Sequence, residues 1–338
     1  MIETLRMQLE ALDPLDLGHW PTPLEPLPRV SRKLGRFDVW VKRDDQTGLA
    51  TGGNKARKLA YLMAEAVRQG ADPVMTTGAQ QSNHARQTAA AAARAGLPCV
   101  LVLGGEPPAA AQGNYLLDTI LGAEVRWAGE QPLMAALTRE ATALREAGRA
   151  PYVIPYGGSN SLGVCGYVAA MLELWEQMRA RDLHFGSIVV ASSSGGTQAG
   201  LLVGARALGY PGRILGISIA EPAKSFRQEI AQLANGAAKL LALDIAIAPA
   251  DVLVSDAYLG GGYGVVSDLE REAIALAGRT EGLLVDPVYT GRALGGLIAQ
   301  ARQGTFAPGE RVLFWHTGGT PALFAYGDAA LPKEPLSP

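Results

Sequence analysis

The chain has 338 residues, of which 48% are hydrophobic, and a net charge of −2 at pH 7. This length allows two domains and a sizeable buried core. The balanced charge argues against a general affinity for nucleic acid or anionic membranes. We therefore expect a small-molecule partner.

The two cysteines and the N-terminal segment bear on the compartment. Cys99 and Cys165 both stand in apolar contexts, which argues against a disulfide framework and favours a reducing environment. The first twenty residues carry acids and lack a continuous apolar core, so they do not resemble a secretion signal. No segment approaches the ~18 uncharged apolar residues of a membrane span. We expect a cytoplasmic protein.

Short runs rich in Val, Ile and Leu alternate along the chain with longer, alanine-rich segments of helical pattern. The runs predict strands at residues 37–42, 72–78, 98–104, 124–129, 151–157, 187–193, 213–220 and 311–319. The helices between them include residues 54–70, 82–96 and 196–209. This alternation indicates an α/β fold whose parallel sheets are covered on both faces. Such sheets bind ligands at the carboxyl ends of their strands.

The segment TGGNKARK places Lys55 about where a helix starts, after Gly52 and Gly53, in a chain with few lysines. The positive end of the helix and partial burial both favour loss of the lysine proton. A neutral amine is what condensation with a carbonyl group requires. The alternative is a solvated surface lysine, which is how we interpret Lys42 and Lys58.

The segment TTGAQQSNHARQ places Ser82, Asn83 and His84 at the next junction between a strand and a helix. The start of a helix can hold a carboxylate through its backbone N–H groups, and Asn83 offers a neutral donor. Ser82 or Asn83 might equally cap the helix. For His84 a proton-donating role and a buried structural role are both open.

The segment VVASSSGGTQAG runs from a buried strand into a helix. Its glycines permit positive φ angles, so that several N–H groups can converge on an anion, and the helix start adds positive potential. The pattern is neither the P-loop nor the dinucleotide fingerprint. It predicts a site for one phosphate at Ser193, Ser194, Gly195, Gly196 and Thr197. The alternative is a tight turn with serine capping.

An aldehyde cofactor that carries one phosphate would engage both Lys55 and the phosphate loop. Pyridoxal phosphate is such a cofactor. A metal site has little support because the four histidines and two cysteines are not clustered. Nicotinamide chemistry lacks its glycine fingerprint and ribose-binding acid.

Two tyrosines stand in further polar segments. Tyr263 lies in the glycine-rich GGGYGVV, which could cover a pocket, and Tyr289 lies in DPVYTGRA, which leads from a possible short strand into a helix. Each might be an ordinary packed aromatic with a satisfied hydroxyl.

Together these segments resemble the fold-type II pyridoxal phosphate enzymes related to the tryptophan synthase β-subunit. Within them the chain is similar to the group of D-cysteine desulfhydrases and 1-aminocyclopropane-1-carboxylate (ACC) deaminases. The motifs KRDD, GGNKxRKL, QSNHxRQTAA, GTQAG, DPVYTGRA and HTGGTPALFAY occur in the order of that group and span nearly the whole chain.

The resemblance implies two open parallel-sheet domains of three layers each (αβα), with the cofactor in the cleft between them. The large domain would comprise residues 1–55 and 166–338, and the small domain residues 56–165. A homodimer is also implied.

The resemblance implies a covalent bond between the cofactor and Lys55. It implies catalytic roles for Ser82, Tyr263 and Tyr289, and substrate contacts from Ser82, Asn83 and His84. Cofactor contacts are then expected from Asn54, Lys55, Asn83, Ser193, Ser194, Gly195, Gly196, Thr197, Thr290 and Thr317.

Thr290 and Thr317 distinguish activities within the group, because ACC deaminases typically carry a glutamate and a leucine there. A hydroxyl serves a neutral pyridine nitrogen, and the shallower electron sink that results favours β-elimination over opening of a cyclopropane. We predict elimination of D-cysteine to pyruvate, hydrogen sulfide and ammonia. The alternatives are an L-cysteate sulfo-lyase, an ACC deaminase and a cofactor-free binding protein. For the sulfo-lyase, Arg57 or Arg86 could bind the sulfonate, although both are as easily solvated helix residues.

Overall fold

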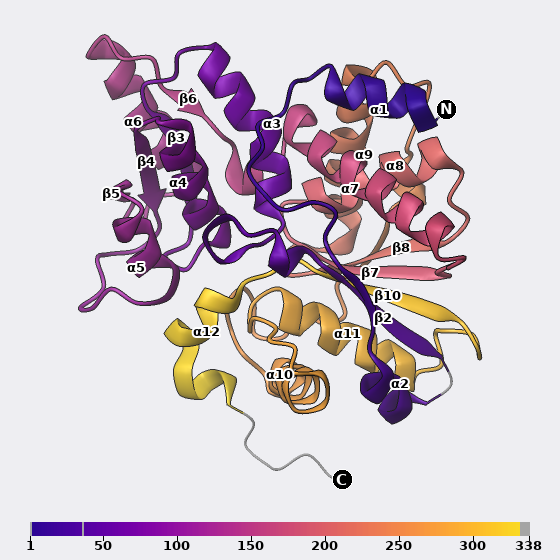
Figure 1. The fold of residues 1–338 in the computed structure, drawn as a ribbon. Helices are drawn as coiled ribbons and strands as arrows, with labels where there is room; N and C mark the ends of the chain where they lie inside the picture. The colour runs from indigo at the N-terminus through magenta and orange to yellow at the C-terminus, as the bar shows by residue number, and fades with distance from the viewer. Residues whose placement is uncertain (1, 36, 332–338) are drawn as a thin grey trace.

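The computed structural model describes residues 2–35 and 37–331, and within them the chain forms two β-sheets covered by helices (Figure 1). The larger sheet has the strand order β1-β2-β10-β7-β8-β9, and the smaller sheet has the order β5-β4-β3-β6. The strands are β1 (Leu24–Pro26), β2 (Asp38–Arg43), β3 (Val74–Gly78), β4 (Cys99–Leu103), β5 (Glu124–Trp127), β6 (Tyr152–Val153), β7 (Ser187–Ser192), β8 (Arg213–Ser218), β9 (Leu253–Ser255) and β10 (Arg311–His316).

The two ends of the chain meet in the larger sheet. β2 pairs in parallel with β10, so that Asp38 lies opposite Arg311. Strand β1 is antiparallel to β2, whereas the remaining neighbours in both sheets are parallel. The predicted α/β fold with parallel sheets is therefore confirmed, with one antiparallel edge strand added. The predicted domain boundaries stay a prediction.

Helices cover both faces of the larger sheet. In Figure 1, α7, α8 and α9 lie on one face, and α10 and α11 lie on the other. The helices are α1 (Ile2–Glu10), α2 (Pro28–Leu34), α3 (Lys55–Arg68), α4 (Asn83–Ala95), α5 (Gly113–Ile120), α6 (Leu133–Glu146), α7 (Ser161–Ala180), α8 (Gly196–Leu208), α9 (Ala223–Leu240), α10 (Asp268–Glu281), α11 (Thr290–Arg302) and α12 (Thr320–Tyr326).

Strand β10 shows how the sequence builds these layers. Leu313 and Trp315 belong to the core cluster on the side of α7 and α8, whereas Val312 and Phe314 belong to the cluster on the side of α11. This alternation is the two-residue period of a strand, and apolar residues on both faces are what a doubly covered parallel strand needs. The carboxyl ends of these buried strands are left to carry polar groups.

The eight predicted strands are all present, with three differences. β6 comprises only residues 152–153 of the predicted 151–157, because the chain turns into a short 3₁₀ helix at Tyr156–Gly158. The short strands β1 and β9 were not predicted. Within residues 282–289 the structure has no strand, so the possible short strand before Tyr289 is wrong. Asp286 there caps the start of α11 instead, accepting hydrogen bonds from the backbone of Tyr289 and Thr290.

The interpretation of Lys42 as a solvated residue is wrong, and the solvated alternative for Arg57 is excluded, because both are buried in a charge network between β2, α3 and α7. Lys42 Nζ donates to the carbonyl of Thr22 at 2.7 Å and pairs with Glu173. Arg57 binds both carboxylate oxygens of Asp44, at 2.9 and 2.8 Å. Burial alone raises the pKa of Asp44, but the charge and hydrogen bonds of Arg57, the charge of Lys42 and the hydrogen bond from Tyr167 together outweigh it and lower that pKa to about 2.

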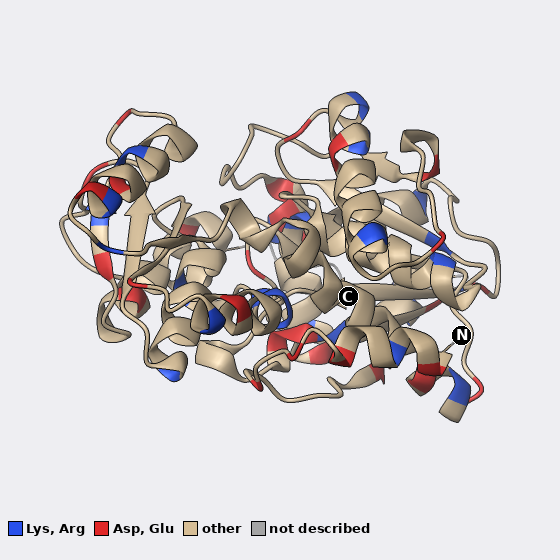
Figure 2. Ribbon diagram, turned by 90° about the horizontal axis from the view of Figure 1, so that it is seen from above, with Lys and Arg blue, Asp and Glu red and all other residues tan. Residues whose placement is uncertain are grey.

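No helix among the described residues has the length and apolar character needed to cross a membrane. Acidic and basic residues are interspersed over the elements seen in Figure 2. This distribution agrees with the near-neutral composition, which predicts no strong field toward a polyanion.

Candidate active site

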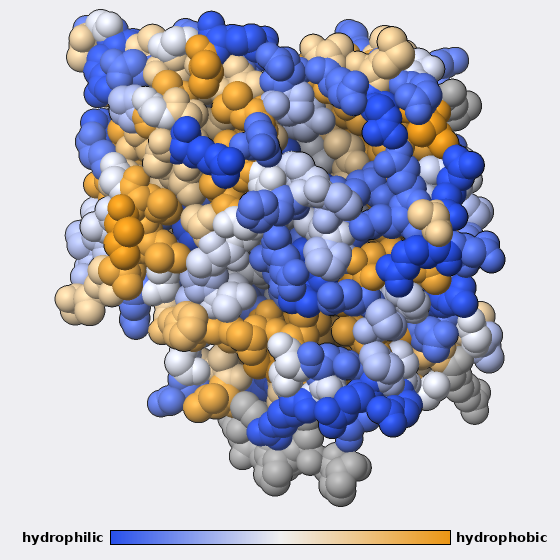
Figure 3. Space-filling view, in the orientation of Figure 1, coloured by the Kyte–Doolittle hydropathy of each residue, from blue (hydrophilic) through white to orange (hydrophobic). Residues whose placement is uncertain are grey.

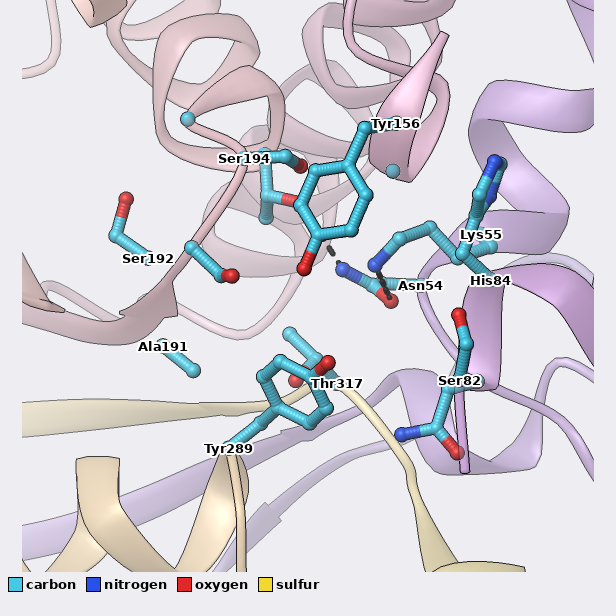
Figure 4. A pocket seen from close by; sticks show the side chains of 15 residues that line it. Asn54, Lys55, Ser82, His84, Tyr156, Ala191, Ser192, Ser194, Tyr289 and Thr317 are labelled. Carbon is cyan, nitrogen blue, oxygen red and sulfur yellow. Dashed lines mark hydrogen bonds between the residues drawn. The ribbon is translucent and has the colours of Figure 1, made fainter. Parts of the chain in front are cut away.

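One pocket gathers most of the predicted residues, at the carboxyl ends of strands from both sheets. Around it β3 leads toward α4, β7 toward α8 and β10 toward α12. Figure 4 shows Lys55, Tyr156 and Tyr289 directed into a common space. The lining residues are Asn54, Lys55, Ser82, Asn83, His84, Tyr156, Gly157, Ala191, Ser192, Ser193, Ser194, Gly195, Thr197, Tyr289 and Thr317.

Three predicted site residues do not line this pocket: Gly196, Tyr263 and Thr290. Gly196 is the first residue of α8, directly after the lining residues of the loop. The hydroxyl of Tyr263 is hydrogen-bonded to that of Tyr289, which does line the pocket, and Thr290 is fully buried. The other predicted residues are brought together, although they come from segments more than 200 residues apart.

Lys55 is the first residue of α3, and its amine reaches into the pocket, where Nζ donates to Asn54 Oδ1 at 3.0 Å. Burial and then the positive charge of Arg86 lower the pKa of the amine to about 8, against a smaller opposing effect of Asp286. A sizeable fraction of the amine is therefore neutral near pH 8. The lowering of the Lys55 pKa agrees with the prediction, which did not include the charge of Arg86.

Two glycines make the turn before Lys55 possible. Gly52 has φ +75°, and a Cβ there would lie 1.9 Å from the carbonyl oxygen of Asp45. Gly53 has φ +132° and packs against the loop after β10, where a Cβ on Gly318 would lie 2.7 Å from its Cα. Residues with side chains cannot replace glycine here without moving the backbone. The two glycines thus set where the amine stands.

The serine-rich loop has the shape expected of an anion site. β7 ends at Ser192, and Gly195 adopts a left-handed conformation (φ +76°) directly before α8. Ser194 Oγ lies 2.8 Å from Ser159 Oγ, and the Gly196 N–H donates to that same Ser159 oxygen at 3.3 Å. Because backbone N–H groups and hydroxyls converge at a helix start, this corner suits a phosphate.

Lys58 is also part of this corner, so its interpretation as a solvated residue is wrong. The side chain is fully buried, and Nζ donates to Ser159 Oγ at 3.0 Å and to the Gly157 carbonyl at 3.1 Å. Burial and then the charge of Lys55 lower the pKa of Lys58 well below its usual value. The spacing of three residues places both lysines on one helix face, a signal that the sequence did contain.

Tyr156 and Ser159 are further residues of the site that the sequence interpretation missed. They follow β6, the strand predicted at residues 151–157, and so lie at the same edge of the smaller sheet as Ser82. The segment YGGSNS after that strand is a polar, glycine-containing junction like the others. It could have been recognised by the same rule.

Ser82 and Asn83 begin α4 at the edge of the pocket. Ser82 Oγ accepts the N–H of Ala85 at 3.1 Å, so Ser82 is a helix cap as well as a pocket residue. Asn83 Oδ1 accepts hydrogen bonds from Arg86 Nη1 at 3.1 Å and from Asn114 Nδ2 at 2.9 Å. Arg86 is fully buried, which excludes the solvated position that was one of the two alternatives for it.

His84 is buried beside Ser82, and its Nε2 lies 2.8 Å from the hydroxyl of Thr76. Burial, followed by the charges of Lys55 and Lys58, lowers the pKa of His84 well below its usual value. The imidazole is therefore neutral at physiological pH. This environment favours the structural role that the sequence left open.

The two threonines occupy different environments. Thr317 follows β10 and lines the pocket. The hydroxyl of Thr290 lies 2.7 Å from Asp286 Oδ1 and 3.3 Å from the carbonyl of Gly318, below the pocket floor. Thr317 thus faces the pocket, whereas Thr290, the first residue of α11, bonds with Asp286.

Comparison with protein families decides what kind of pocket this is. Residues 15–318 match the family described as pyridoxal-phosphate dependent enzyme. The chain belongs to this family. Its cofactor is pyridoxal phosphate, and the alternative of a cofactor-free binding protein is overturned.

Two relatives of this pyridoxal-phosphate dependent enzyme cover nearly the whole chain. D-Cysteine desulfhydrase of Yersinia enterocolitica serotype O:8 / biotype 1B (strain NCTC 13174 / 8081) is 43% identical over 330 residues, which are 96% of this chain and 98% of the relative. A crystal structure of an ACC deaminase homologue has a TM-score of 0.87 and 41% identity, and the match covers 96% of this chain and 98% of that one. The predicted fold-type II class is confirmed.

A more distant solved structure shows the fold alone. Diaminopropionate ammonia lyase of Escherichia coli has a TM-score of 0.69 at 15% identity, with 97% of this chain and 90% of that chain covered. The fold is therefore kept where most of the sequence has changed.

The residues present fit the cofactor of the family. The hydroxyl oxygen of Ser192 lines the pocket and is buried without a hydrogen-bond partner among the described residues, so it has unused capacity for a ligand. A Cβ on Gly196 would lie 2.5 Å from Ser159 Oγ, which shows how closely backbone approaches the anion corner. Lys55 stands across the pocket from this corner, as an aldehyde with a distal phosphate requires.

Proposed function

We propose that the protein catalyses the α,β-elimination of D-cysteine, which with one water gives pyruvate, hydrogen sulfide and ammonia. The relative named D-cysteine desulfhydrase supports this reaction through its 43% identity over nearly the full length. The ACC deaminase homologue is almost as similar, so the choice between the two activities depends on the pocket itself.

The observation that carries the proposal is the absence of an acidic side chain from the lining of the pocket, among the residues that the structure describes. Thr317 supplies a hydroxyl there instead. A carboxylate beside the pyridine nitrogen would keep it protonated and strengthen the electron sink, whereas a hydroxyl serves a neutral nitrogen. A weaker sink suffices when a good leaving group such as sulfide departs from the β-carbon.

Pyridoxal phosphate, when bound, supplies an aldehyde that condenses with amines and a ring that withdraws electrons from the substrate α-carbon. We assign its phosphate to the loop from Ser193 to Thr197 and to Ser159, with Lys58 beneath it. We assign its covalent attachment to Lys55. The polar groups on both sides of the pocket are already held by hydrogen bonds, so they need little reorganisation to bind it.

Lys55 also acts as the base. Its amine is neutral in part because burial and Arg86 lower its pKa to about 8. A neutral amine released from the cofactor can take the α-proton of the substrate, and a pKa near the working pH suits this task. Asn54, which accepts from Lys55 Nζ at 3.0 Å and donates to Thr197 Oγ1 at 3.0 Å, orients the amine.

The start of α4 orients the substrate. Ser82 and Asn83 line the pocket at this helix start, where the positive end of the helix attracts a carboxylate. Fixing the carboxylate sets which bond at the α-carbon points toward Lys55. His84, neutral and bonded to Thr76, supports the wall behind them.

Tyr289 is the residue we assign to the departing sulfur. Burial raises its pKa well above the usual tyrosine value, so the hydroxyl keeps its proton and can donate a hydrogen bond to the departing sulfur. The bond between Cβ and sulfur breaks as the α-proton passes to Lys55, and the sulfur leaves as hydrosulfide, which Tyr289 stabilises by that hydrogen bond. The released enamine tautomerises and hydrolyses in water to pyruvate and ammonia.

The pocket disfavours the L-cysteate alternative. A sulfonate leaving group calls for cationic partners, but no arginine lines the pocket among the described residues. Arg57 is bound to Asp44 in the charge network, and Arg86 lies behind Asn83.

A substrate panel tests the proposal. D-Cysteine, L-cysteine, L-cysteate, D-serine and ACC are each incubated with the purified enzyme, and keto acid, sulfide and sulfite are measured. We expect pyruvate and sulfide in equal amounts from D-cysteine. Sulfite from L-cysteate without sulfide from D-cysteine, or α-ketobutyrate from ACC at a comparable rate, would refute it.

We further propose a homodimer. Exposed apolar side chains on α5 and α12 support it, namely Leu116, Ile120 and Phe324, the last of which is 73% exposed. In Figure 3, hydrophobic residues gather over the region where Figure 1 shows α5 and α12. An apolar patch of this kind is typical of a subunit contact. Sedimentation velocity of the parent protein and of Phe324→Asp checks this, and a monomeric parent protein would contradict it.

We propose a cytoplasmic location because neither cysteine is in a disulfide. Cys99 and Cys165 are both buried free thiols, as suits a reducing compartment. Fractionation of the source cells, followed by immunodetection of the protein, tests this location.

A further inference from the structure

Arg86 occupies an unusual position beside the active site. It lies in the first turns of α4 and is fully buried, and its guanidinium contacts three different segments. Nη2 donates to the carbonyl of Gly52 at 2.8 Å, and Nη1 donates to Asn83 Oδ1 at 3.1 Å and to Asn114 Oδ1 at 2.6 Å. It joins the loop before Lys55 to the start of α4 and to α5.

We propose that Arg86 is the positioning residue of this site, whose guanidinium clamps the Lys55 loop to the Asn83 amide. It does not line the pocket. It acts through Gly52 and Asn83. The proposal rests on the proposed pyridoxal phosphate site but not on the identity of the substrate.

The clamp fixes the orientation of the Asn83 amide. Asn83 Oδ1 accepts both from Arg86 Nη1 and from Asn114 Nδ2, so this end of the amide is the acceptor end. Asn114 is itself held by Gln81, whose Oε1 accepts the Asn114 N–H at 2.8 Å. Because Asn83 lines the pocket, its Nδ2 is left as a neutral donor for an oxygen of the cofactor or substrate.

The clamp also brings an uncompensated charge to the site. Among the described residues Arg86 has no carboxylate within ion-pair distance, and its partners are neutral oxygens. The carboxylates that act on it from farther away are Asp118 and Asp286. Burial raises the pKa of Asp118 to about 7, and both of its oxygens lack a hydrogen-bond partner. Asp118 thus neutralises Arg86 only in part near neutral pH.

A buried guanidinium without a carboxylate partner is costly to fold. Its field favours the neutral amine at Lys55 and an anionic substrate group at Asn83. The other charged or titratable groups that act on Lys55 are Asp286, which opposes this effect, and Lys58 and His84, whose own pKa values respond to Lys55. Both consequences serve one site and offset the cost of burying this charge.

Three variants of the full chain separate charge from geometry. Arg86→Met removes both, and Arg86→Lys keeps the charge but not the fork of hydrogen bonds. Arg94→Met makes the same chemical change on an exposed position of the same helix. After removal of the cofactor, the pKa of Lys55 is read from the pH dependence of its acetylation by mass spectrometry. The Kd of pyridoxal phosphate is measured by absorbance.

We expect Arg86→Met to raise the pKa of the Lys55 amine by about one and to weaken pyridoxal phosphate about 10- to 100-fold. Arg86→Lys should leave the pKa near the parent value and weaken the cofactor about 10-fold, since the Asn83 amide is no longer held. Arg94→Met should change neither quantity. These readouts need no substrate, so they stand even where D-cysteine is not turned over.

An unchanged Lys55 pKa and an unchanged Kd in folded Arg86→Met would overturn the proposal. If that variant does not fold, Asn114→Ala decides the question, because it removes one bond to the Asn83 amide and leaves the charge of Arg86 in place. If the proposal is right, Asn114→Ala binds pyridoxal phosphate more weakly than the parent protein and leaves the pKa of Lys55 unchanged. A parent-like Kd in Asn114→Ala together with a parent-like Kd in Arg86→Lys refutes it.

Discussion

The hydroxyl oxygens of Tyr263 and Tyr289 lie 2.5 Å apart, which joins a side chain that lines the pocket to one that is 36% exposed. Burial raises the pKa of the Tyr289 phenol well above its usual value, so this hydroxyl keeps its proton and its position is set by the bond to Tyr263. The carbonyl groups of Gly262 and Val265, on either side of Tyr263, are held by Arg292 at 3.1 and 2.9 Å. The glycine-rich loop is therefore anchored at the point where it meets the pocket.

Tyr289→Phe is expected to lower kcat for D-cysteine by about 10-fold, because the departing sulfur loses one hydrogen bond to a charged group. The loss should be smaller with β-chloro-D-alanine, since chloride is the better leaving group and needs less stabilisation. Steady-state kinetics with both substrates check this, and Tyr115→Phe, which does not line the pocket, serves as the control. Equal losses with the two substrates would show that Tyr289 does not act on the leaving group.

Lys55→Ala is expected to lower kcat by about 10³-fold or more, because it removes both the covalent attachment and the base. The visible absorption that borohydride abolishes in the parent enzyme should be absent, and no peptide containing residue 55 should carry reduced cofactor. Lys224→Ala, on an exposed face of α9, is the matched control. Parent-like turnover by Lys55→Ala would contradict the proposed site.

The rate at which the cofactor-free protein takes up pyridoxal phosphate is expected to rise with pH and to level off above about pH 8. The neutral amine is the reactive form, and burial with the charge of Arg86 lowers the pKa of Lys55 to about 8. Below that pH the protonated fraction grows and the rate falls tenfold per pH unit. Stopped-flow absorbance measures this profile. A rate that still climbs at pH 10 would indicate an ordinary lysine.

Glu270→Gln is expected to lower the free energy of unfolding by about 3 kcal/mol, because it leaves the buried charge of Arg292 unpaired. The two side chains are fully buried and lie 2.6 Å apart. Glu272→Gln, which breaks the exposed pair with Arg302, should change stability by less than about 0.5 kcal/mol. Urea denaturation of both variants makes the comparison. Similar losses in the two would mean that burial does not set the cost.

Residues whose role depends on local chain geometry were predictable from the sequence. The strands follow from short apolar runs, and Lys55 stood out because two glycines and a helix start adjoin it. The serine-rich loop was recognisable because a buried strand, a left-handed glycine and a helix start follow one another within a few residues. These features are properties of short segments, so no knowledge of the packing was needed.

The environments of Lys42, Arg57, Lys58 and Arg86 were not predictable in the same way: the two lysines were interpreted as solvated, and for the two arginines a solvated position and a sulfonate contact were both left open. They are buried because α3 and α4 pack against segments distant in the chain, and the partners that make this burial tolerable come from elsewhere, such as Glu173 for Lys42 and Ser159 for Lys58. A helix of mixed polarity does not show which of its charged residues will find such partners.

The sequence by itself therefore determined the α/β architecture, the amine and the anion loop, because local periodicity and turn chemistry specify them. Only the tertiary structure decided that Thr317 faces the pocket while Thr290 turns to Asp286. It likewise decided that Arg86 stands near Lys55 and, among the described residues, has no carboxylate within ion-pair distance. Electrostatic effects depend on distances between groups far apart in the chain and on the water excluded between them, and both exist only once the chain has packed.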